Sequence, residues 1–496
     1  MNTKNNDVAG RSALKAGIWY TISNFLIKAV PFITTPIFTR IMTEGEIGAF
    51  SNIMSWCSIL AVIVTFEIFS SVSIARFDYK DNLDEYISSS LLLGSLITFA
   101  FYICVLIFHS FFENLFMMDF QTINIVFIYL LVYPAIQMFQ IRNQISYKYV
   151  STIVAAIIEC LLTSIVSLAC TLAFSNRLQG RVLGFFVPSI IFSTIIYNYL
   201  MHKGKRVSTK YWKYAIAISF PLIFHLLAGS LLTSSDRIMI SKICGTEYAA
   251  IYSVSYMLAT IVMVLWNSMN SAWSPWAYDM MDKKQYVKLK SNSKPYFIFF
   301  LIVVFSIIML APEMLLILGG SNYVDGKYII PPVMVGCLFQ FVYSLYVNIE
   351  FYHKKQKNIA IGTIIAACIN IFLNILLLPK IGYVAAAYTT LIGYISLYII
   401  HFMFVKRLNC EKWYDTNFFV KILSVMVIMI PIFICLYRIN VIRYAIILIL
   451  ICVFSIIVVQ NIDLIKEILK NRSLSVIKEI KILDKMYKFD VSTGKN

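Results

Sequence analysis

Residues 17–39 read GIWYTISNFLIKAVPFITTPIFT, an apolar stretch with a single charged residue, Lys28, near its middle. A helix of about 20 apolar residues is long enough to cross a bilayer. A cation near the bilayer centre costs roughly 2.5–3.5 kcal/mol on insertion scales, so it normally faces a water-filled cavity or a partner charge. The stretch therefore predicts a membrane-spanning helix that carries a functional or paired lysine.

Further stretches of the same kind follow along the chain. Of the 496 residues, 60% are hydrophobic and only 14% are charged, so most of the chain is expected to lie in lipid. The predicted fold class is an all-α polytopic membrane protein with about 14 transmembrane helices. The predicted spans are residues 17–39, 48–74, 86–109, 121–141, 150–173, 181–201, 214–235, 248–272, 296–318, 329–351, 359–378, 382–404, 417–437 and 441–460.

The net charge of +17 has a strongly one-sided distribution. Of the 42 Lys and Arg residues, 31 fall on the side of the N-terminus, 9 on the opposite side and 2 within spans. Basic residues collect on the cytoplasmic side of membrane proteins. Both termini are therefore predicted to be cytoplasmic, and the charge indicates attraction to anionic membrane lipids, with no nucleic-acid partner.

Short matches between the two halves of the chain indicate an internal repeat. They occur in the same order in both halves, which favours parallel repeats related by an axis along the membrane normal, with a cavity between them. The matches pair residues 40–42 with 237–239, 48–51 with 250–253, 148–150 with 357–359, and Gly180 with Gly382. The predicted domains are an N-terminal lobe at 1–205 (spans 1–6), a C-terminal lobe at 206–408 (spans 7–12), spans 13–14 at 409–461, and a cytoplasmic amphipathic tail at 462–496.

Charged residues inside the predicted spans are the first candidates for a binding site. Lys28 and His225 fall at matching positions of the two repeats, so each half offers a cation at a similar depth. Glu67 is expected within ~6 Å of the depth of Lys28. Lys28 therefore either lines a substrate cavity or forms a buried pair with Glu67. Glu159 in the fifth span is either a proton site or an internal partner.

Arg40, Asp236 and Arg237 lie at predicted external ends of spans. Each either contacts substrate or anchors its helix end. Gly180 and Gly184 lie four residues apart and predict a close contact with a neighbouring helix.

The sequence lacks several motifs that would indicate an enzyme. No phosphate-binding G-x-x-x-x-G-K-[ST] loop occurs, and no nucleophile or metal-ligand pattern stands out. We therefore predict a transporter with no catalytic residue, no metal and no cofactor, and with coupling to a proton or sodium gradient as an open possibility. A membrane polysaccharide polymerase or ligase is the alternative from another class, but it usually has a larger external loop than any predicted here.

The motifs around spans one and seven resemble those of a known family. They are Gly17-Ile18-Trp19, Pro31, Pro36, Arg40 and TEGEIGAFS at 43–51, then DRIMI at 236–240, GTE at 245–247 and IYSV at 251–254. This pattern is similar to the Wzx-type flippases for O-antigen and capsular repeat units, in the multidrug/oligosaccharidyl-lipid/polysaccharide exporter superfamily. The chain departs from it at Ala250, where such proteins often have glycine.

The resemblance implies two six-helix lobes that expose a central cavity to each side of the bacterial cytoplasmic membrane in turn. It implies a substrate of undecaprenyl-diphosphate carrying a short oligosaccharide, with other polysaccharide assembly proteins as further partners. Two related functions stay open within the same superfamily. They are a lipid-linked peptidoglycan precursor flippase, and a drug/cation antiporter, for which acidic cavity residues and twelve spans are expected.

Overall fold

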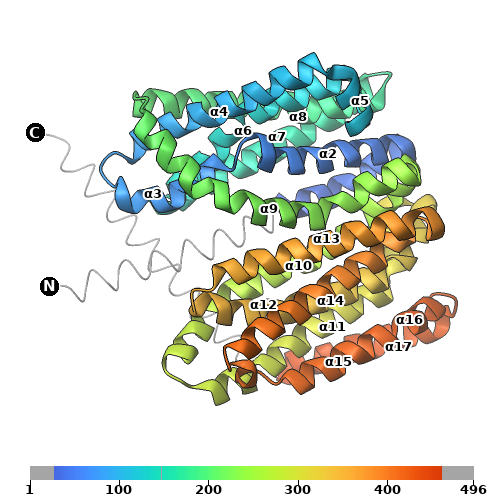
Figure 1. The fold of residues 1–496 in the computed structure, drawn as a ribbon. Helices are drawn as coiled ribbons and strands as arrows, with labels where there is room; N and C mark the ends of the chain where they lie inside the picture. The colour runs from blue at the N-terminus through green and yellow to red at the C-terminus, as the bar shows by residue number, and fades with distance from the viewer. Residues whose placement is uncertain (1–26, 147, 461–496) are drawn as a thin grey trace, which may run out of the picture. The chain divides into compact units, whose positions relative to one another are not determined.

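The computed structural model describes residues 27–146 and 148–460, and nearly all of them lie in helices (Figure 1). The first described helix covers residues 27–41. The later α-helices are α2 (Glu44–Val64), α3 (Val72–Asp78), α4 (Leu83–Ile107), α5 (His109–Phe116), α6 (Phe120–Ile145), α7 (Tyr149–Ala173), α8 (Arg177–Gly204), α9 (Thr209–Ile243), α10 (Thr246–Asp282), α11 (Tyr286–Gly319), α12 (Ile330–Tyr352), α13 (Gln356–Ile381), α14 (Val384–Arg407), α15 (Thr416–Ile428), α16 (Ile430–Leu436) and α17 (Asn440–Gln460). Short 3₁₀ helices are η1 (Ile68–Ser71), η2 (Ser321–Tyr328) and η3 (Glu411–Trp413).

The helix pattern confirms the predicted fold class. In the described chain, 11 helices are long and apolar enough to cross a membrane, or 12 if α15 and α16, bent by 44°, form one span. With the helix at 27–41 and α17 included, every predicted span overlaps a helix. The predicted span at 329–351 corresponds to α12, and 89% of its apolar segment is buried inside the protein.

The second span differs from its prediction. Residues 48–74 were expected to form one helix, but α2 ends at Val64 and the chain continues as η1 and α3. Phe66 and Glu67 both have positive φ, at 51° and 50°, and two such residues in succession end a right-handed helix. The Thr65 hydroxyl stabilises the break, because it donates to Ala61 O (2.6 Å) and accepts from Glu67 N–H (3.3 Å).

The described part of the chain divides into two compact units, with the boundary between Ile434 and Cys435. Within the first unit, α4, α6, α7 and α8 pack around one another, and α10 to α14 form a second group (Figure 1). Helix α9 packs against α13, and α2 packs against both α9 and α10. The helices of the two predicted repeats therefore meet along α2, α9 and α10.

The contact between α7 and α8 confirms the glycine prediction. A Cβ at Gly180 would lie 2.4 Å from Cys170 O, and one at Gly184 would lie 2.4 Å from Ser167 Cα. Only glycine lets the two backbones approach this closely.

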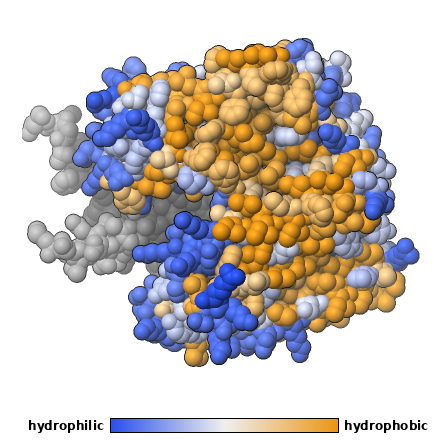
Figure 2. Space-filling view, viewed as in Figure 1, coloured by the Kyte–Doolittle hydropathy of each residue, from blue (hydrophilic) through white to orange (hydrophobic). Residues whose placement is uncertain are grey.

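The surface has the pattern of a membrane protein. Figure 2 shows an apolar band over the middle of the helices, with hydrophilic side chains gathered toward their ends. Large apolar side chains such as Ile165 (65% exposed) and Phe372 (61% exposed) contribute to the exposed surface. Such a contiguous apolar surface is expected to face lipid tails.

Two sequence-based expectations lie outside the described residues. One is the Gly17-Ile18-Trp19 part of the family resemblance, and the other is the amphipathic tail between Asp463 and Tyr487.

Candidate functional site

A cavity of about 540 Å³ lies where the helix at 27–41, α2, α8, α9 and α10 meet. Its lining combines basic groups, hydroxyl groups and apolar side chains, with no Asp or Glu among the described residues that line it. The polar lining residues are Lys28, Thr35, Ser51, Ser55, Ser58, Arg181, Ser234, Arg237, Ser253 and Thr260.

Helix α2 supplies a face of hydroxyl groups to this cavity. Its start is fixed by a capping box, in which Thr43 N–H donates to Glu46 Oε2 (2.8 Å) and Glu46 N–H donates to Thr43 Oγ1 (3.3 Å). Ser51, Ser55 and Ser58 follow at spacings of four and three residues, which place them on one side of the helix. The capped start thus sets the register that points these hydroxyl groups into the cavity.

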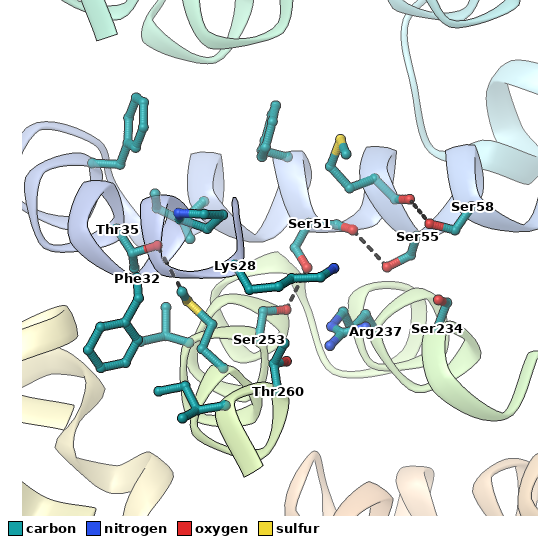
Figure 3. A pocket seen from close by; sticks show the side chains of 18 of the residues that line it. Lys28, Phe32, Thr35, Ser51, Ser55, Ser58, Ser234, Arg237, Ser253 and Thr260 are labelled. Carbon is teal, nitrogen blue, oxygen red and sulfur yellow. Dashed lines mark hydrogen bonds between the residues drawn. The ribbon is translucent and has the colours of Figure 1, made fainter. Parts of the chain in front are cut away.

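The two repeats touch through matching residues. Ser51 of α2 and Ser253 of α10, which are paired in the sequence repeat, lie with their Oγ atoms 2.5 Å apart (Figure 3). The contact joins the two halves directly beside the cavity, so any separation of the halves must break it.

Lys28 lines the cavity, with its ammonium end near Arg237 (Figure 3). It forms no ion pair with Glu67 in the described part of the chain. Glu67 is buried in the break after α2, where it accepts a hydrogen bond from Ser70 Oγ (3.1 Å). The structure therefore places Lys28 in the cavity and Glu67 away from its lining.

Arg181 of α8 is a cavity residue that the sequence interpretation missed. Its guanidinium lies between the rings of Phe38 and Phe50, at 4.1 and 4.0 Å from the two ring centroids. Cation–π contacts with two rings stabilise a charge that is shielded from water and hold the planar group in place. The available signal was that Arg181 is the only charged residue in the span at 181–201.

Arg237 and Asp236, adjacent in sequence, have different environments on α9. Arg237 lines the cavity, donates to Thr233 O (2.9 Å) and stacks 4.8 Å from the Tyr256 ring centroid. Asp236 is 2% exposed and does not line the cavity. Its carboxylate accepts hydrogen bonds from Tyr252 Oη (2.7 Å), Asn374 Nδ2 (2.7 Å) and Thr390 Oγ1 (2.5 Å), which tie α9 to α10, α13 and α14.

Arg40 and His225 also lie outside the cavity lining. Arg40 donates to Ile317 O at 3.2–3.3 Å, and Thr39 beside it donates to Leu318 O (2.7 Å). These bonds hold the end of the first helix against the end of α11, so the two halves are in contact at the end that is predicted to be external. His225 is half-buried on α9, and its Nδ1 has no hydrogen-bond partner among the described residues.

The arrangement suits a compact anion. Three basic side chains converge on one cavity, and serine and threonine hydroxyl groups can donate hydrogen bonds to further anionic oxygens. The apolar remainder of the lining keeps the local dielectric low, which strengthens these interactions.

Comparisons with known proteins identify sequences related to this chain. The family model described as "Polysaccharide biosynthesis protein" matches residues 13–281. The chain is 22% identical to "Lsg locus putative protein 1" of Haemophilus influenzae over 416 residues, covering 79% of this chain and 98% of that protein. It is 26% identical to the "Capsular polysaccharide biosynthesis protein CapF" of Staphylococcus aureus over 414 residues, covering 78% and 98%.

Solved structures share the fold at low sequence identity. The structure titled "Lipid II flippase MurJ, inward closed conformation" matches with a TM-score of 0.66 and 17% identity, over 90% of this chain and 100% of that one. An outward-facing multidrug resistance MATE family transporter of the MOP superfamily matches with a TM-score of 0.58 and 14% identity, over 82% and 97%. The fold is therefore that of the MOP superfamily.

Proposed function

The chain belongs to the polysaccharide biosynthesis protein family, and we propose that it is a flippase for lipid-linked oligosaccharides. Its substrate is undecaprenyl-diphosphate carrying an oligosaccharide repeat unit for O-antigen or capsule. The protein moves this lipid from the inner to the outer leaflet of the bacterial cytoplasmic membrane by alternating access.

The observation that carries the proposal is a cavity lined by Lys28, Arg181 and Arg237, with no carboxylate among the described residues that line it. A diphosphate is the part of such a lipid that is hardest to move through a bilayer, because it is compact and anionic. The three cations can balance its charge, and the serine hydroxyl groups of α2 and α10 can donate to the remaining phosphate oxygens.

The size of the cavity indicates which part of the substrate it holds. A volume of about 540 Å³ is typical of a site for a small molecule, so it fits the diphosphate and the sugar next to it. The polyprenyl tail is apolar and can stay in the lipid during transport. The rest of the glycan then extends toward the membrane face to which the cavity is open.

Two related functions compete with this proposal. A lipid-linked peptidoglycan precursor also carries a diphosphate, and the structural similarity to a lipid II flippase keeps it as the second candidate. A drug/cation antiporter needs negative charge to bind its substrate. The absence of Asp and Glu from the described cavity lining disfavours that function.

The test is complementation of flippase-null strains that each depend on one defined glycan pathway. We expect the gene to restore surface polysaccharide in at least one O-antigen or capsule strain, and not to replace the peptidoglycan precursor flippase. Arg181→Ala should lower that export, whereas Lys421→Ala should leave it unchanged, because Lys421 lies outside the cavity lining. Rescue of the peptidoglycan strain alone would replace the proposal with the second candidate.

A further inference from the structure

A line of polar side chains continues along α10 from the cavity toward the helix end that is predicted to be cytoplasmic. Its first two members line the cavity (Figure 3). The same seven-residue spacing then recurs twice, with a further polar residue four positions after each recurrence. Seven residues are close to two helical turns, so these side chains lie on one side of the helix. We call this set the α10 polar stripe, and it consists of Ser253, Thr260, Asn267, Ser271, Ser274 and Tyr278.

The outer part of the stripe, from Asn267 onward, lies beyond the cavity. Val264, one turn before Asn267, is the last residue of α10 that lines the cavity. Arg237 stacks on Tyr256, and the helical rise places Asn267 roughly 16 Å from Tyr256 along α10. The outer stripe therefore lies between the cavity cations and the helix end predicted to be cytoplasmic, where the glycan beyond the first sugar has to be accommodated.

A buried amide of α12 holds the outer stripe in place. Asn348 is 4% exposed, and its Oδ1 accepts from Tyr278 Oη (3.4 Å) while its Nδ2 donates to Asn270 Oδ1 (3.4 Å). Ser274 Oγ lies 3.1 Å from both Asn348 Oδ1 and Asn270 Oδ1, and it can donate to either. Because Asn270 uses its Oδ1 within this network, its Nδ2 remains available as a donor.

The polar groups beside this network have spare hydrogen-bonding capacity. Asn267 is exposed, and its side-chain amide makes no hydrogen bond to another described residue. Each carboxamide can donate twice and accept twice. Trp266, one turn before Asn270, is half-buried, and its Nε1 donates to Ser344 Oγ of α12 (3.2 Å), which fixes the orientation of the ring. Free amide groups thus lie next to an aromatic ring that is held in place.

The chemistry of this surface fits an uncharged sugar. Between Glu247 and Asp279, α10 contains no charged residue, so the outer stripe offers no charge to attract a phosphate or a carboxylate. Amide and hydroxyl groups both donate and accept, as do the hydroxyl and acetamido groups of a sugar. An indole ring adds an apolar face against which the C–H groups of a sugar ring can pack.

We propose that the outer α10 polar stripe, together with Trp266 and Asn270, is a glycan-binding site for uncharged sugars of the repeat unit beyond the one attached to the diphosphate. This inference rests on the proposed function. Asn267 and Asn270 contact the sugars, and Asn348 is a positioning residue that orients Asn270. A lipid that carries only its first sugar occupies the cavity alone, so the outer stripe acts only on longer glycans.

The first test compares two lipids in vesicles that contain the full-length protein. One is undecaprenyl-diphosphate with the complete repeat unit of a strain that the gene complements, and the other carries only the first sugar of that unit. Asn267→Ala and Asn270→Ala should each lower transport of the complete lipid about three- to tenfold, as expected for the loss of one hydrogen bond, and leave transport of the one-sugar lipid unchanged.

Asn292→Ala is the matched control for these variants. Asn292 is also an exposed asparagine, but it lies on α11, seven residues before Phe299 and therefore on the same face as this exposed apolar side chain. The control should transport both lipids as the wild type does. Equal transport of the complete lipid by the wild type, Asn267→Ala and Asn270→Ala would overturn the glycan site and leave the flippase function standing.

A measurement without lipid separates the two proposals. Oligosaccharides released from the repeat units of the complementation strains are titrated into the purified full-length protein, and binding is followed by tryptophan fluorescence. At least one of them should bind, Asn267→Ala should bind it about three- to tenfold more weakly, and Trp266→Phe, which keeps an aromatic ring, should lose the fluorescence change.

The outcomes of this titration are distinct. If an oligosaccharide binds in this way but the wild type moves no lipid, the glycan site stands and the flippase function is wrong. If no oligosaccharide binds, or if Trp266→Phe keeps the full fluorescence change, the glycan site is wrong. Trp266→Phe decides the location of binding even if neither asparagine variant folds.

Discussion

Neighbouring residues of this protein have different roles because their side chains point in different directions from the helix. Asp236 and Arg237 are consecutive on α9, yet the first binds polar groups inside the C-terminal helices and the second reaches the cavity. Consecutive residues of an α-helix point about 100° apart, so side chains at the same height along one helix can face different surroundings. The same principle lets α8 press Gly180 and Gly184 against α7 while Arg181 lies between two aromatic rings.

Replacing Lys28 by alanine is predicted to lower glycan export strongly while membrane abundance stays near normal. Loss of a charge contact in a shielded site costs about 2 kcal/mol or more, which corresponds to roughly a thirtyfold weaker interaction. Lys28→Arg should retain part of the activity, because it keeps the positive charge. Export is measured as surface polysaccharide per copy of the protein, and wild-type export by Lys28→Ala would rule out a role for this residue in the cavity.

At the scale of elements, the contact between α2 and α10 is one of the places where the two halves meet. The loop before α10 contains Gly245, whose φ of 114° is accessible to few residues other than glycine. This turn brings Thr246 against α2, where a Cβ at Gly48 would lie 1.7 Å from Thr246 O. Close approach of the two helices therefore depends on a glycine in each half.

Gly48→Ala is predicted to prevent this close contact. The added methyl group would overlap a backbone atom and cost about 1–3 kcal/mol or more, so the halves should separate at this end and export should fall. Gly45→Ala is the matched control, because its Cβ would meet Thr246 Oγ1 at an ordinary 3.6 Å. Thiol labelling of Ser253→Cys reports the separation, and equal labelling in both glycine variants would contradict the prediction.

A disulfide between α2 and α10 should lock the same contact. The Ser51 and Ser253 Oγ atoms are 2.5 Å apart, so Ser51→Cys with Ser253→Cys is predicted to cross-link readily and to stop export until reductant is added. Arg40 and Arg237 are also paired in the sequence repeat, but Arg40 contacts Ile317 whereas Arg237 lines the cavity. Undiminished export by the cross-linked protein would mean that separation of these helices is not part of transport.

At the scale of the whole molecule, the charge distribution and the even number of predicted spans give one topology. Cysteines introduced at Lys205 and Lys355 are predicted to react with membrane-impermeant reagents only from the cytoplasmic side, and one at Lys327 only from outside. Four long helices, α9 to α12, lie between Lys205 and Lys355 in the structure. An even number of spans between two positions puts both of them on the same side of the membrane. External labelling at position 355 would overturn the assignment of sides.

The sequence alone determined the helical membrane fold and the approximate positions of most spans, and it predicted a site at Lys28. These properties follow from the length of apolar runs and from the cost of burying charge in lipid, and both can be counted along a chain. The repeat also predicted that residues 48–51 and 250–253 correspond, and the contact between Ser51 and Ser253 joins them in space.

Only the tertiary structure decided which charges share a site. It grouped Arg181 with Lys28 and Arg237, and it separated Glu67, Asp236 and His225 from the cavity lining. It also paired Glu350 with His401, which are far apart in sequence. The physical reason is that the rotation of each helix about its axis is set by packing against several neighbours at once, and the sequence of one helix does not contain that information.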